Sequence, residues 1–237
     1  MAHTWSHTCA KELLYRYELP ALKANDKYLM KEIVLYYIHD PMCSWCWGFK
    51  HTYEKLIKDL PNTIRIEKLL GGLAKDSDVE MPKEMQLSIK NTWQRIEQTI
   101  PGVLFNYEFW DKCIPKRSTY PACRAIIAAG KQHDKFKDLM LSEIQSAYYQ
   151  HAKNPSELET LITISGKIGL DPIIFSHDII SDAVEHQLLT QLEKVRQLNV
   201  DSFPSLVLQL GGNIFRVPVS YTNHKTMIEL IDSLTNS

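Results

Sequence analysis

Two cysteines with two residues between them, Cys43 and Cys46, form the pattern in this sequence that most directly indicates chemistry. A dithiol of this spacing can exchange disulfides if one thiolate attacks and the other cysteine resolves the mixed disulfide. The pair follows an apolar, β-branched and aromatic run over residues 33–38 and precedes a helical pattern over residues 51–60. The free N–H groups and positive dipole end at a helix start favour thiolate over thiol. We therefore predict that Cys43 is the exposed nucleophile and that Cys46, one turn further in, is the buried resolving cysteine.

A zinc site or a pair of core cysteines is the alternative interpretation of this spacing. Zinc would need a second C-x-x-C pair or a histidine pair nearby. Cys113 and Cys123 have nine residues between them, and His3, His7 and Cys9 lack a fourth ligand. We expect no metal and no other cofactor. We also expect Cys113 and Cys123 to be unpaired, with Cys123 as a buried small apolar residue.

Aromatic and titratable residues flank the cysteine pair. We predict that Trp45, between the cysteines, forms an apolar platform for substrate, with core packing as the alternative. Trp47 and Phe49 enter the helix, and we expect them in the core. His39 and Asp40 end the strand. Either could relay a proton, but we expect a hydrogen-bonded histidine and a solvated strand-end charge.

The elements that must hold this pair follow a β-α-β order, then a helical stretch, then an α-β-β-α order. Residues 63–67 alternate as a strand, which a right-handed crossover places parallel to the first strand. Apolar residues three and four positions apart predict several helices in the middle of the chain. Residues 205–217 read as a hairpin, and a last helix spans about residues 222–234. The helical stretch is most simply an insertion in a single α/β domain.

Composition narrows the function classes. The chain has 237 residues, 44% of them hydrophobic and 23% charged, which is an ordinary globular balance. A net charge of −1 gives no basic excess for nucleic acid or an anionic membrane. No apolar window has the length of a membrane span, and the first forty residues show no signal-peptide pattern. With five sparse cysteines, this favours a reducing, cytoplasmic location.

The order of elements, with Phe203-Pro204 at the head of the hairpin, resembles the thioredoxin fold. The helical stretch narrows the resemblance to the DsbA-like thiol oxidoreductases. Residues 40–48 look like the predicted protein disulfide isomerase branch of that family, and residues 119–125 and 198–204 are also similar to it. The fold class implied is α/β, a thioredoxin fold with a large all-helical insertion.

This resemblance divides the chain into four parts. We expect an N-terminal extension outside the fold, a first β-α-β half, the helical insertion and an α-β-β-α second half, at residues 1–29, 30–77, 78–183 and 184–237.

The resemblance also implies site residues. It predicts a cis Pro204 beside the disulfide, which would leave the Phe203 backbone free to pair with a bound peptide. The substrate-binding residues we expect are Ser44, Trp45, Phe203 and Pro204. Ser44-Trp45 replaces the Pro-His dipeptide of the strongly oxidising periplasmic members, so a moderate thiol-exchange enzyme is the better expectation.

The function predicted is thiol–disulfide oxidoreductase or protein disulfide isomerase, working on protein or peptide thiols and disulfides. Two alternatives stay open. One is a glutathione-dependent kappa-type transferase or isomerase of the same fold, although those enzymes usually lack the C-x-x-C. The other is a non-enzymatic holdase that captures unfolded peptides. Glutathione is a further candidate partner in the first two cases.

Overall fold

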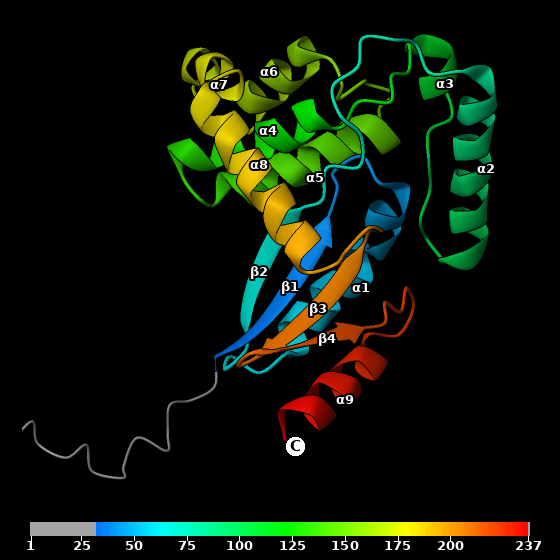
Figure 1. The fold of residues 1–237 in the computed structure, drawn as a ribbon. Helices are drawn as coiled ribbons and strands as arrows, with labels where there is room; N and C mark the ends of the chain where they lie inside the picture. The colour runs from blue at the N-terminus through cyan, green and yellow to red at the C-terminus, as the bar shows by residue number, and fades with distance from the viewer. Residues whose placement is uncertain (1–31, 237) are drawn as a thin grey trace, which may run out of the picture. The chain divides into compact units, whose positions relative to one another are not determined.

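The computed structural model describes residues 32–236, and a four-stranded mixed sheet lies at its centre (Figure 1). The strand order is β2-β1-β3-β4. β1 pairs in parallel with β2 and antiparallel with β3, and β3 and β4 form the antiparallel hairpin. Both predicted pairings are therefore confirmed. The strand bounds are β1 (Ile33–His39), β2 (Arg65–Leu70), β3 (Ser205–Leu210) and β4 (Asn213–Val217).

The central strand β1 is buried on both faces. Leu35 and Tyr37 pack with α1 (Ser44–Asp59) and α9 (His224–Thr235) on one side. On the other side, alternate residues of β1 pack with α8 (Asp182–Gln197). Side chains alternate between the two faces of a strand, so helices on both faces hold β1 in place up to its last residue. The turn that carries the cysteines starts from this fixed end.

The second strand lies later in the chain than predicted. Residues 63–67 were expected, whereas β2 runs from Arg65 to Leu70. Leu69 and Leu70 pair with Ile38 and His39, so β2 reaches the same level as the last residues of β1. The helix after the cysteines begins at Ser44, so Cys43 lies at the helix start as predicted, and the chain turns directly from β1 into α1.

Six helices separate β2 from α8, which confirms a thioredoxin fold with a helical insertion (Figure 1). The exact limits at residues 78 and 183 stay a prediction, and the predicted extension over residues 1–29 lies outside the described residues. No helix within residues 32–236 has both the length and the apolar character of a membrane span. The insertion helices are α2 (Lys83–Thr99), α3 (Phe109–Lys112), α4 (Tyr120–Gln132), α5 (Phe136–Tyr149), α6 (Leu158–Lys167) and α7 (Pro172–Ile179).

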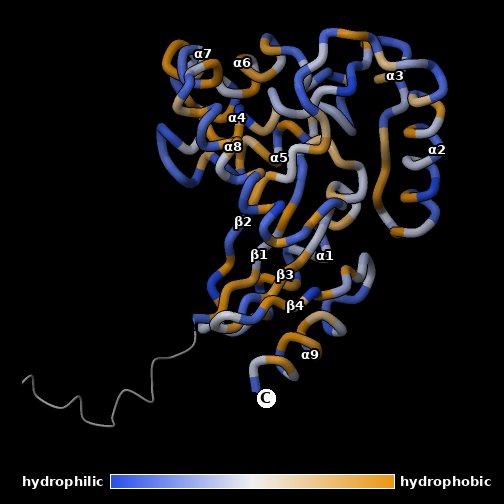
Figure 2. The backbone as a smooth tube through the Cα atoms, viewed as in Figure 1, coloured by the Kyte–Doolittle hydropathy of each residue, from blue (hydrophilic) through white to orange (hydrophobic). Residues whose placement is uncertain are grey.

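An aromatic cluster centred on Trp93 of α2 forms the core of the insertion beside the cysteine turn. Trp93 is fully buried. In Figure 2 hydrophobic and hydrophilic residues alternate along α2, as expected for a helix with one buried face. Six rings have centroids 4.8–6.2 Å from that of Trp93: Phe105, Tyr107, Phe109, Trp110, Tyr148 and Tyr149.

Candidate active site

The two cysteines occupy the turn between β1 and α1. The Cys43 N–H donates to the Asp40 carbonyl over 3.1 Å, and Cys43 then serves as the N-cap residue of α1. The Cys46 N–H donates to the Cys43 carbonyl over 2.9 Å, which closes the first turn. Cys46 is 1% exposed and Cys43 is 7% exposed, so the predicted order of burial holds, but Cys43 is more buried than predicted. The loop before β3 lies against it, because the Phe203 carbonyl accepts a hydrogen bond from the Cys43 thiol.

The pKa values of the two thiols are shifted in opposite directions. A hydrogen bond from the Cys46 side chain lowers the pKa of Cys43, and the backbone N–H groups of Cys46 and Trp45 add to this effect against the opposing effect of burial. Burial raises the pKa of Cys46 well above its ordinary value. Cys43 is thus the thiol that ionises first, and Cys46 remains protonated beside it. This asymmetry is what a nucleophile and a resolving thiol need.

The loop before β3 brings Phe203 and Pro204 to Cys43. The Phe203–Pro204 peptide bond is cis, as predicted. The Cys43 thiol donates to the Phe203 carbonyl over 3.3 Å. Gly71, just after β2, lies under the Phe203 ring, where an added Cβ would stand 2.2 Å from a ring carbon. A glycine suits this close approach, and no pattern in the sequence identifies Phe203 as its partner.

The two residues between the cysteines point in different directions. The Ser44 hydroxyl accepts a 2.8 Å hydrogen bond from the buried Trp93 indole, so this side chain ties the turn to the insertion. Trp45 is half-buried, with its ring 4.9 Å from that of Tyr221 and under the guanidinium of Arg95. The predicted contacts of Ser44 and Trp45 with substrate stay predictions.

Two further aromatic residues of α1 were expected in the core. Phe49 is fully buried, which confirms its prediction. Trp47 is half-buried and stacks on Tyr149 of α5, with ring centroids 5.5 Å apart. Trp47 therefore packs against the insertion from the edge of its core.

Asp40 is not the solvated strand-end charge that the sequence suggested, because it is 0% exposed. Its carboxylate accepts from the Met42 and Leu73 N–H groups over 2.8 and 2.7 Å. It also accepts from the Thr119 hydroxyl over 2.7 Å and from the Cys123 thiol over 3.7 Å. Burial raises the pKa of Asp40, and these hydrogen bonds from Leu73, Thr119 and Met42 oppose the rise. The carboxylate joins the cysteine turn to the start of α4.

His39 also differs from its prediction. It is 3% exposed and stacks on Tyr37, but its Nδ1 has no hydrogen-bond partner among residues 32–236. Burial lowers its pKa to about 3, helped by the charge of Lys68. His39 is therefore a neutral packing residue and not the hydrogen-bonded histidine expected at the strand end.

The remaining cysteines agree with expectation. No disulfide links the four cysteines of residues 32–236. Cys123 is fully buried, although its thiol is used as a donor to Asp40, and Cys113 is half-buried. No group of three or more His, Cys, Asp or Glu side chains within the described part of the chain is arranged to hold a metal ion. The predicted alternative at His3, His7 and Cys9 lies outside the described residues.

A groove of about 360 Å³ opens above Cys43, and we call it the Cys43 groove. The cysteine turn forms its floor. Its walls come from α2, α5 and the loops before α2 and α4 in the insertion, and from the loop before β3. Cys46 does not line it. The residues on its walls include Met81, Ile89, Arg117, Tyr148, Asp201 and Phe203.

Comparisons with known proteins find similar sequences. The model of a family described as Thioredoxin matches residues 36–211. The ClpXP adapter protein SpxH of Halalkalibacterium halodurans is 23% identical over 82% of this chain, and that of Bacillus subtilis is 24% identical over 81%. The chain spans 64% of the length of each of these curated relatives.

Solved structures share the fold. A “putative protein disulfide isomerase” from Nitrosomonas europaea superimposes with a TM-score of 0.75 and 24% identity, covering 87% of this chain and 98% of that one. The cytosolic disulfide reductase DsbM from Pseudomonas aeruginosa gives a TM-score of 0.67 and 19% identity, covering 86% of this chain and 100% of that one. DsbM has also been solved with GSH.

Proposed function

Since this chain belongs to the thioredoxin family whose model matches residues 36–211, we propose that it is a thiol–disulfide oxidoreductase working through Cys43 and Cys46. The observation that carries the proposal is the asymmetry of the pair. Cys43 is the N-cap residue of α1, lines the groove and has a lowered pKa, whereas Cys46 is more deeply buried and has a raised pKa. Cys43 can therefore act as the nucleophile and Cys46 as the resolving thiol.

The exchange follows from these positions. The Cys43 thiolate attacks one sulfur of a substrate disulfide, forms a mixed disulfide and releases the other sulfur as a thiolate. Cys46 then loses its proton, attacks the Cys43 sulfur and releases the second thiolate. The enzyme ends as a Cys43–Cys46 disulfide, and two electrons pass to the substrate. An external dithiol returns the pair to the reduced form, and the reverse sequence oxidises a substrate dithiol.

Residues around Cys43 suit peptide substrates. We propose that Trp45 provides an apolar surface and that Phe203 and Pro204 meet the bound peptide beside the sulfur, with Ser44 in the floor. The Phe203 carbonyl, which accepts from Cys43 in this dithiol state, is a main-chain group that a peptide N–H could use when the thiol leaves it.

Alkylation and turnover assays with cysteine variants test this function. Cys43→Ser should lower the rate at which dithiothreitol reduces a model disulfide to the uncatalysed rate, and Cys46→Ser should accumulate a mixed disulfide. Cys113→Ser is the matched control, because Cys113 is half-buried and donates to the Ala152 carbonyl away from the groove. Turnover that survives Cys43→Ser would overturn the proposal.

We also propose isomerase activity, glutathione as a partner and a cytoplasmic location. Isomerase activity is supported by the name of the Nitrosomonas neighbour and is tested by recovery of activity from scrambled ribonuclease. Glutathione as a partner and a cytoplasmic location are supported by the names of the DsbM structures. Glutathione is tested by turnover of its disulfide, and the location by fractionation of cells that make the full chain.

The names of the curated relatives favour a second candidate function, that of a ClpXP adapter. An adapter must bind the protease complex whether or not it exchanges disulfides. Capture of purified ClpXP by both the wild-type chain and Cys43→Ser would support this function. Absence of binding by either protein would contradict it.

A further inference from the structure

We infer that Arg117 is the anchor for a carboxylate on the substrate, so that the Cys43 groove selects thiols and disulfides with an acidic group near the sulfur. This inference rests on the proposed dithiol exchange at Cys43. Arg117 lies two residues before Thr119, in the loop that leads into α4. It lines the same groove as Cys43.

Arg117 is the uncompensated cation of this groove. Its side chain is half-buried, and it has no hydrogen bond or ion pair to any residue within 32–236. An arginine offers five N–H donors in a planar fork that matches a carboxylate. A half-buried charge without a partner does not stabilise the fold. We therefore expect a ligand to supply the partner.

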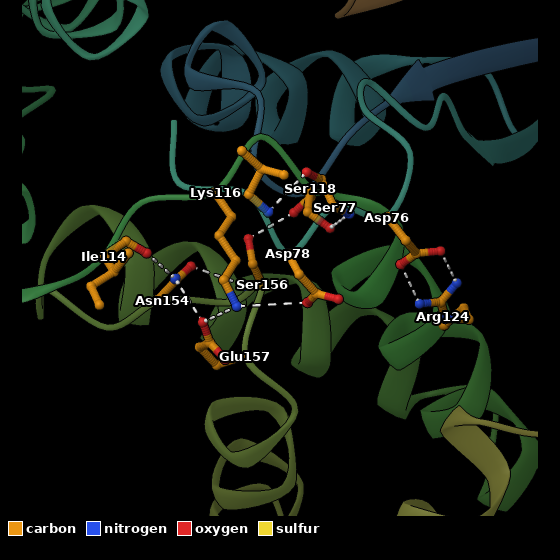
Figure 3. A network of polar contacts seen from close by, with 11 residues as sticks. Asp76, Ser77, Asp78, Ile114, Lys116, Ser118, Arg124, Asn154, Ser156 and Glu157 are labelled. Atoms are coloured by element: carbon orange, nitrogen blue, oxygen red, sulfur yellow. Dashed lines mark hydrogen bonds and ion pairs between the residues drawn. The ribbon is translucent and has the colours of Figure 1, made fainter. Parts of the chain in front are cut away.

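The neighbouring Lys116 shows the contrast, because its charge is already neutralised. Lys116 also lines the groove, but its ammonium lies 3.0 Å from Glu157 and 3.8 Å from Asp78 (Figure 3). In the same network Ser156 donates to the Ser118 carbonyl, and Asn154 donates to the Ile114 carbonyl. These bonds hold the loop over residues 114–118 in place on both sides of Arg117. The backbone at Arg117 is therefore held in place, while its guanidinium has no partner among residues 32–236.

The charge of Arg117 acts on the groove itself. Burial raises the pKa of Tyr148, a wall residue, and the Arg117 charge opposes that rise. The same is true of Asp40 beneath the turn, where burial dominates and Arg117 opposes it. The guanidinium thus lies close enough to influence a wall residue of the groove and the carboxylate beside the cysteine turn.

One other free charge lines the groove. Asp201 is exposed and has no ion pair to a described residue. Because it is exposed, water and salt screen it more than the half-buried Arg117. The groove should therefore prefer an anionic substrate over a cationic one of the same size.

Three small symmetrical disulfides test this preference: anionic dithiodipropionate, neutral hydroxyethyl disulfide and cationic cystamine. With wild-type protein, kcat/KM for the anionic disulfide should exceed that for the neutral one by about fivefold, which is what a half-exposed ion pair supplies. The ratio should fall toward one at high salt. Arg117→Ala should remove the preference, Arg117→Glu should invert it, and Arg117→Lys should keep part of it.

Controls separate this inference from the proposed function. Turnover of the neutral disulfide reports dithiol exchange and folding in every variant, so each preference is expressed as a ratio to it. Arg65→Ala removes one arginine at the far end of β2, where the side chain is 51% exposed and pairs with Glu32 and Glu67, and should leave the preference intact. A preference that survives Arg117→Ala, or one that is lost in Asp201→Asn, overturns the role of Arg117. Absence of turnover with all three disulfides instead overturns the function itself.

Discussion

His39 and Asp40, at the start of the cysteine turn, are buried titratable residues whose contributions to folding stability change with pH in opposite directions. Burial lowers the pKa of His39 to about 3. Burial raises the pKa of Asp40 even though hydrogen bonds oppose it. In both cases the folded state favours the neutral form. Acid therefore works against folding at His39 and in favour of folding at Asp40, and each side chain contributes its own pH dependence to stability.

We expect His39→Leu to flatten the acid side of the stability profile. His39 stays neutral in the folded protein, whereas the unfolded chain binds a proton below a pKa of about 6.5. The stabilisation from His39 is fully present above that pH and is lost as the pH falls toward about 3. Between about pH 7 and about pH 5 the wild-type protein should lose about 2 kcal/mol more than the variant. Urea unfolding at both pH values measures the difference, and equal losses would contradict it.

Asp40→Asn should make Cys43 a stronger acid. The hydrogen bond from Cys46 is the main cause that lowers the pKa of Cys43, and the negative charge of Asp40 opposes it. Removing that charge should lower the pKa of Cys43 further. The pH dependence of alkylation by iodoacetamide reports this pKa.

Thr119→Val is the matched control for this change. It removes the 2.7 Å hydrogen bond to Asp40 but keeps the carboxylate charge. A Cys43 pKa that stays the same or rises in Asp40→Asn would contradict an electrostatic role for the carboxylate.

At the scale of elements, the insertion holds the first turn of α1 by specific contacts. Trp93 of α2 donates to Ser44, Trp47 stacks on Tyr149 of α5, and Thr119 at the start of α4 donates to Asp40. Thr119 occupies the N-cap position of α4, but its hydroxyl does not cap the helix. Its hydrogen bond goes to the cysteine turn instead. Three insertion helices therefore position the site, each through a side chain that ends at or next to the turn.

Trp93→Phe should loosen this turn. The change keeps an aromatic ring in the cluster but removes the indole donor, which leaves the buried Ser44 hydroxyl without its partner. We expect a loss of about 2 kcal/mol in the free energy of unfolding. Chemical denaturation measures that loss, and the alkylation rate of Cys43 should change with it.

Trp110→Phe is a matched control within the same cluster. The Trp110 indole N–H is buried without a hydrogen-bond partner among the described residues, so the same truncation removes no bond. If the two variants lose equal stability, ring size and not the hydrogen bond to Ser44 determines the effect.

For the molecule as a whole, local sequence patterns predicted the helices and strands. They did not predict contacts between residues that are far apart in the sequence. The run ending at His39 and the C-x-x-C spacing are visible within twenty residues, and resemblance supplied the cis Pro204. The partners of Asp40 lie up to 83 positions away, so nothing near Asp40 in the sequence indicates its burial. The same holds for Gly71 under Phe203. Periodicity reports which face of an element is buried, but not which distant residue covers it.

The sheet and the insertion should unfold together, in a single transition. One continuous core contains Trp93 and Ile144 of the insertion together with Met42, Leu70 and Leu188 from the sheet side. Exposing the core of either part would also expose apolar surface of the other, which favours cooperative unfolding. Far-ultraviolet circular dichroism follows all helices and strands, and near-ultraviolet circular dichroism follows the aromatic cluster around Trp93. In urea the two signals should have the same midpoint. Loss of the aromatic signal well before the helical signal would show that the insertion core opens while the sheet and its helices remain folded.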